Sequence, residues 1–71
     1  MANGYTIGME SRSKRRAIVS KIIAQLDDLR CNEEVFLDNV PNNLQDSAAC
    51  ENAEHSVAFL RDAIEALEFA Y

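Results

Sequence analysis

The residues with the most obvious chemical potential in this 71-residue chain are its one histidine and the acids beside it. Glu51 and His55 are four residues apart and Glu54 adjoins His55, so the Glu-x-x-His spacing of di-iron helical bundles is absent. One histidine and two separated cysteines do not supply the four ligands of a structural zinc site. The sequence therefore predicts no metal site and no cofactor.

The two cysteines would act as nucleophiles only with a general base beside them. Helical periodicity predicts that Cys50 lies in a core, Cys31 on an outer face and His55 in solvent, so no such pair is expected. A glycine-rich phosphate loop is also absent, because Gly4 and Gly8 are the only glycines. We expect no catalytic residue, no enzymatic activity, and free thiols in a cytoplasmic protein without a secretory signal.

Charge is divided unevenly along the chain, whose net charge is −5. Residues 1–21 hold five bases against one acid, whereas residues 22–71 hold two bases against eleven acids. The five bases, which are candidate contacts for a charged partner, are Arg12, Lys14, Arg15, Arg16 and Lys21. They would either bind nucleic acid weakly or neutralise the C-terminal end of a helix. Nucleic acid is not the favoured partner, because the acidic residues of 22–71 repel phosphate. An alternative hypothesis is that the chain is an acidic inhibitor that imitates nucleic acid.

Apolar periodicity predicts two helices after a flexible N-terminal arm at 1–12. Within a hairpin at 13–71, helix 1 is expected at about 13–39, a turn at 40–46 and helix 2 at about 47–70. Pro41 stops the first helix, and Asp46 or Ser47 can cap the second. In helix 1, the heptad pattern places Val19, Leu26, Glu33 and Val40 at a and Ile22, Leu29 and Phe36 at d. In helix 2, it places Cys50, Val57, Ile64 and Tyr71 at a and Ala53, Leu60 and Leu67 at d.

These two apolar seams match each other in an antiparallel arrangement. Leu26 then faces Leu60, and Tyr71 comes to lie beside Arg15. The sequence therefore predicts an all-α fold, an antiparallel two-helix hairpin with coiled-coil packing. No apolar run is long enough to span a membrane, so no membrane partner is expected.

A second apolar stripe on helix 2 lies outside the seam and consists of Phe59, Ala63, Ala66 and Ala70. Ile18, Ile23 and Leu37 are expected to form a similar outer stripe on helix 1. Since two helices cannot bury both stripes, we predict a homodimer that forms a four-helix bundle. The alternative is a monomer that exposes Phe59 and Phe69. Glu33 interrupts the seam, either as a residue that fixes register or as one that reaches solvent past Ala53.

The turn contains an Asn-x-Pro-x-x-Leu-Gln-x-Ser pattern, formed by Asn39, Pro41, Leu44, Gln45 and Ser47. Leu60, Ala63 and Leu67 then give a Leu/Ala-seamed helix. Over residues 26–70 the chain resembles small uncharacterised helical-hairpin proteins of bacterial, plasmid and phage genomes. The resemblance implies the hairpin fold and no activity. We expect a non-enzymatic interaction or regulatory module with an unidentified protein partner, and an origin in a mobile element is a further hypothesis.

Overall fold

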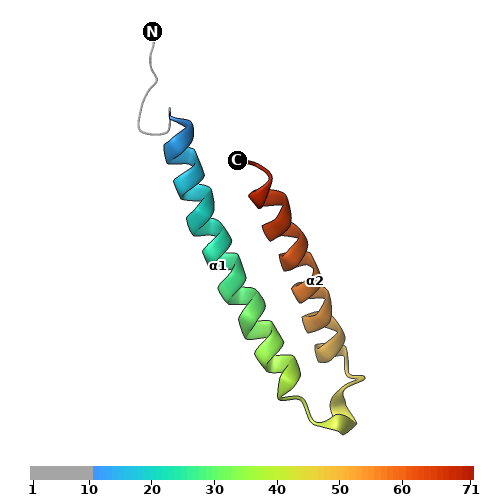
Figure 1. Cartoon of the computed structure of the whole chain (residues 1–71). Helices are drawn as coiled ribbons and strands as arrows, with labels where there is room; N and C mark the ends of the chain where they lie inside the picture. Colours follow the sequence, from blue (N-terminus) through green and yellow to red (C-terminus); the bar gives the residue numbers. More distant parts are fainter. Residues whose placement is uncertain (1–10) are drawn as a thin grey trace.

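Two long helices make up most of residues 11–71, the part of the chain that the computed structural model describes. Helix α1 spans Arg12–Asp38 and helix α2 spans Ala48–Glu68, and the short 3-10 helix η1, Asn42–Leu44, lies in the turn between them. Figure 1 shows α1 and α2 side by side in opposite directions, joined at one end by the turn. The predicted all-helical fold of two packed helices is confirmed, and no strand occurs in the described range. Residues 1–10, which form most of the expected arm, lie outside it.

Each helix begins at a serine that satisfies a free backbone N–H group. The Ser11 hydroxyl accepts a hydrogen bond of 3.0 Å from the Lys14 amide, and Ser47 accepts one of 3.3 Å from the Cys50 amide. At the other end of α1, the Asn39 side chain donates to the Val35 carbonyl at 2.9 Å. Pro41 follows two residues later and cannot continue the helix. Local sequence therefore fixes where both helices begin and where the first ends.

The seam of α2 follows its predicted heptad closely. Cys50 and Ala53 are buried, with exposed fractions of 3% and 4%, and they are the only fully buried residues in the described range. Farther along α2, the half-buried apolar residues are Val57, Leu60, Ala63, Ile64 and Leu67. Cys50 and Ala53 both have small side chains and lie in the half of α2 nearer the turn. The resulting core is thin, and much apolar surface stays outside it.

The seam of α1 differs from the prediction by a rotation about the helix axis. Ile22, Leu29 and Phe36 were expected to face α2, but their exposed fractions are 41%, 52% and 43%. Ile23 and Leu37, expected on the outer stripe, are instead half-buried together with Val19, Leu26 and Val40. The expected positions of these five residues are wrong, whereas the a positions Val19, Leu26 and Val40 are in the seam as predicted. Ile18 is exposed, as expected. The observed rotation brings Glu34 within reach of Arg61 on α2, an ion pair that the apolar pattern does not encode.

The two thiols are expected to react at very different rates. Cys50 is buried, and its Sγ donates to the Leu44 carbonyl at 3.4 Å, whereas Cys31 is exposed and its Sγ accepts from the Arg30 Nη2 at 3.2 Å. A thiol reagent should therefore modify Cys31 at least about tenfold faster than Cys50, because the reagent must reach the sulfur and only Cys31 is exposed. Mass spectrometry of peptides after timed labelling checks this order. Equal or reversed rates would contradict the burial of Cys50.

Candidate interaction face

One side of the hairpin carries large apolar side chains that no other part of the described chain covers. On α1 these are Ile22, Leu29 and Phe36, spaced seven residues apart, and on α2 the corresponding residue is Phe59, 72% of which is exposed. Leu29 and Phe59 line the same groove, so the two helices present these residues on the same side. We call this side the apolar face. Helical periodicity adds Ile18 on α1 and Ala49, Ser56, Ala63 and Ala66 on α2, and Ala70 follows just past the end of α2.

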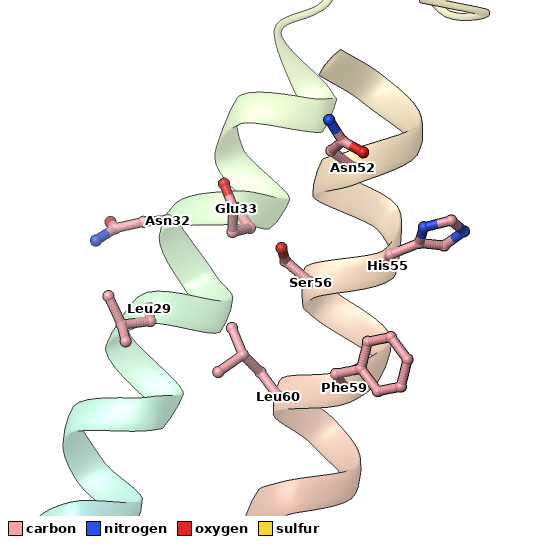
Figure 2. Close-up of a pocket in the computed structure, with 8 residues that line it drawn as sticks. All are labelled: Leu29, Asn32, Glu33, Asn52, His55, Ser56, Phe59 and Leu60. Carbon is pink, nitrogen blue, oxygen red and sulfur yellow. The ribbon is translucent and has the colours of Figure 1, made fainter. Parts of the chain in front are cut away.

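The groove in the apolar face is open and has a volume of about 710 Å³. Figure 2 shows Leu29 and Asn32 along its α1 edge and His55 and Phe59 along its α2 edge. Ser56 and Leu60 point between the helices, and the small Ser56 side chain leaves the hollow. The groove has an apolar half at Leu29, Phe59 and Leu60, and a polar half formed by Asn32, Glu33, Asn52, His55 and Ser56.

The polar half of the groove contains the residues that sequence reasoning considered for chemistry. Glu33 is half-buried on α1 and His55 is exposed on α2, and neither Cys31 nor Cys50 lines this groove. Within residues 11–71, no group of three His, Cys, Asp or Glu side chains is placed to hold a metal ion. What the groove presents to a binding partner is therefore an apolar hollow bordered by a few hydrogen-bonding side chains.

The opposite side of the hairpin carries a charged network centred on Arg30. Its guanidinium binds Asp27 at 2.8 Å and Glu34 at 2.7 Å, and Glu34 also accepts from Arg61 of α2 at 2.5 Å. These hydrogen bonds raise the pKa of Arg30 further above its usual range, with Asp27 contributing most. Hydrogen bonding from Arg61, followed by Arg30, lowers the pKa of Glu34. One side of the hairpin is thus apolar and the other charged.

The depressed pKa of Glu34 predicts a specific dependence of stability on pH. Its ion pairs should stabilise the hairpin above the ordinary carboxyl pKa of 4.5 and lose this contribution as the pH falls through the lower pKa of the folded state. Glu34→Gln should therefore melt a few degrees below the wild type at pH 6, and the difference should shrink below about pH 4.5 and at high salt. Thermal melts by circular dichroism measure this, with Asp28→Asn as the control for loss of an exposed acid. A difference that is independent of pH would contradict the assignment.

The basic start of α1 lies next to the C-terminal end of α2. The Arg12 guanidinium lies 4.7 Å from the centre of the Tyr71 ring, a cation–π contact. Arg16 and Tyr71 line a second, smaller groove together with Val19 and Leu67. The expectation that Tyr71 returns to the basic segment is therefore met, and its ring contacts the Arg12 guanidinium. This arrangement gives at least part of the basic segment a role within the fold.

Sequence reasoning found half of the apolar face. Of the four residues predicted on α2, Phe59, Ala66 and Ala70 are exposed and Ala63 is half-buried beside them. The large residues on α1, Ile22, Leu29 and Phe36, were missed because they had been assigned to the seam. A signal was present: helix 1 has apolar residues at a, d and e, which is more than one partner helix can cover.

Comparisons with known proteins add no identification: no protein-family model matches the chain, and no curated protein or solved structure does so either. Neither α1 nor α2 is both long enough and apolar enough to cross a membrane.

Proposed function

We propose that this chain is a non-enzymatic protein–protein interaction module that works as a homodimer, with the two apolar faces packed together as a four-helix bundle. The exposure of Phe59, Leu29 and Phe36 on one side of the hairpin is the observation that supports this most strongly. Exposed aromatic and aliphatic groups of this size, gathered on one surface and bordered by polar residues, are typical of interaction sites.

The energetics favour such an association. Within residues 11–71, only Cys50 and Ala53 are fully buried, so an isolated hairpin has a small core. Burying the remaining exposed area of Ile18, Ile22, Leu29, Phe36 and Phe59 contributes on the order of 1–2 kcal/mol per side chain. Over two copies this is comparable with or larger than the ~4–15 kcal/mol cost of association. Dimerisation thus completes a core that the single hairpin lacks.

We favour a second copy of the chain as the partner of the apolar face, because the hairpin is apolar on one side and charged on the other. Its other side carries the Arg30, Glu34 and Arg61 ion pairs, and most of the exposed large apolar side chains lie on the apolar face. Two such hairpins placed face to face cover both apolar faces at once and leave both charged sides in solvent. The outward charged surface would then serve to bind a protein partner.

The nucleic-acid hypothesis for the basic segment receives less support. The Arg12 guanidinium is engaged with the Tyr71 ring, and the segment lies beside the C-terminal end of α2, where cations are favourable. The acidic residues Asp27 and Glu34 are paired with arginines of the same chain, which reduces the negative surface that an imitation of nucleic acid would need. We therefore propose protein–protein interaction ahead of both charge-based alternatives.

Sedimentation equilibrium of the full chain tests this proposal. The expected result is a species of twice 7.9 kDa at micromolar concentration, dissociating only on strong dilution. Because the driving force is apolar burial, raising the salt concentration should not weaken the dimer. A mass of 7.9 kDa at 100 µM would contradict the proposal.

A further inference from the structure

The apolar face has an internal pattern that specifies how a second copy would bind. We infer that the two copies pack with their turns at the same end, so that α1 of each copy lies on α2 of the other. This inference rests on the proposed dimer and adds its orientation. It depends on the sizes of the side chains along the two helices and on which residues lie at the same level of the hairpin.

The two helices contribute columns of opposite size to the apolar face. The α1 column consists of large residues seven apart, namely Ile22, Leu29 and Phe36. The α2 column consists of small residues with the same spacing, namely Ala49, Ser56 and Ala63, and Ala70 follows just past the end of α2. Residues seven apart on a helix point in nearly the same direction, so each column is straight. One helix therefore presents protrusions and the other hollows.

The grooves between the helices show which parts of these columns lie at the same level. Leu29 and Ser56 line one groove, Val19 and Leu67 a second, and Leu37 and Cys50 a third. Ile22 follows Val19 by three residues and Ala63 precedes Leu67 by four, so these two lie at almost the same level. By the same counting Phe36 lies level with Ala49. Every large residue of the α1 column is thus level with a small residue of the α2 column.

Two face-to-face orientations are available to a symmetric dimer. With the turns at the same end, α1 of one copy lies over α2 of the other, and Ile22 meets Ala63, Leu29 meets Ser56 and Phe36 meets Ala49. With the turns at opposite ends, α1 lies over α1 and α2 over α2. Large residues then meet large ones while small residues meet small ones, which forces two different helix separations. Alternation of large and small residues fills space at one uniform separation, so the first orientation packs better.

Phe59 fits the same orientation. It lies between Ser56 and Ala63 on α2, and therefore level with the part of α1 between Leu29 and Ile22. On α1 that stretch holds Gln25, which interrupts the large apolar column. With the turns together, the Phe59 ring of one copy would pack on the aliphatic part of the Gln25 side chain of the other. The Leu29 side chain of the other copy would enter the hollow above Ser56, beside Leu60. The same contacts recur by symmetry.

Spin-label distances decide the orientation. A chain with Cys31→Ser and Cys50→Ala is labelled either at the turn, through Asn43→Cys, or at the start of α1, through Ser13→Cys. Dipolar EPR should then give a distance of about 15–30 Å between the two copies for either label alone. In mixed dimers, with one copy labelled at the turn and the other at the start of α1, the distance should rise to about 40 Å, the length of a 27-residue helix.

The opposite pattern, long for each label alone and short in the mixture, would overturn this orientation while leaving the dimer itself intact. A monomer in sedimentation with no dipolar signal would overturn the proposed function as well. A second readout avoids dependence on the cysteine-free background: chains with Ile22→Cys and chains with Ala63→Cys, both also carrying Cys31→Ser, are mixed and oxidised. A disulfide between the two kinds of chain supports the inference, and disulfides only within one kind contradict it.

Discussion

Phe59→Glu is expected to convert the dimer into a monomer, with the dissociation constant raised by about 1000-fold. The wild-type ring is 72% exposed in the single hairpin and would be covered in the bundle. Truncating a central aromatic residue at an interface typically costs ~2–4 kcal/mol, and a carboxylate in its place must also be desolvated. Sedimentation equilibrium over a dilution series measures the shift.

Phe69→Glu is the matched control for this variant. Phe69 is 83% exposed, more than Phe59, but it caps the C-terminal end of α2, where helical periodicity directs it away from α1. We expect Phe69→Glu to leave the dissociation constant within about threefold of the wild type. Equal weakening by both variants, or by neither, would show that the apolar face is not the interface. Circular dichroism establishes whether each variant retains its helices.

Ala53→Asp is expected to have the largest effect on folding. Ala53 is 4% exposed in the seam between the helices, and Glu33 occupies the nearby part of α1. A buried, unpaired carboxylate costs ~3 kcal/mol or more, a large part of the stability of so small a domain. Thermal melts should therefore show a chain that is largely unfolded, or a midpoint lowered by more than about 15 °C.

Ala58→Asp supplies the control for helix propensity, since it makes the same exchange at an exposed position of α2. Its midpoint should fall by only a few degrees, because Asp is a poorer helix former than Ala by less than about 1 kcal/mol. If the two variants melt together, Ala53 is not at the point where the helices meet.

The sequence predicted α2 better than α1, and the difference has a physical cause. Along α2 the residues at a and d are apolar and those beyond the stripe are mostly charged or small, so one phase of the helix satisfies the pattern. Along α1, apolar residues occupy a, d and e, which allows two phases. The choice between them depends on contacts across the hairpin, such as the ion pair between Glu34 and Arg61. Local periodicity carries no information about that pair.

The same ambiguity limited what could be foreseen about the interaction face. Phe59 was recognisable because the heptad of Cys50, Val57 and Ile64 places it outside the seam, so a large aromatic residue remained uncovered. Leu29 and Phe36 also fit d positions of the seam, so the heptad pattern alone does not mark them as exposed. The position of Cys50 followed directly from its a position next to the turn, and the structure buries it as expected.

Contacts between copies through the apolar face are the central claim, and isotope-filtered NMR on a mixture of labelled and unlabelled chains observes them directly. We expect intermolecular NOEs that connect the Phe59 ring of one copy with methyl groups of Ile22 or Leu29 of the other. Such NOEs cannot arise within one chain when only labelled-to-unlabelled transfer is detected. A spectrum without intermolecular NOEs to Phe59, under conditions where the mass is that of a dimer, would contradict the account.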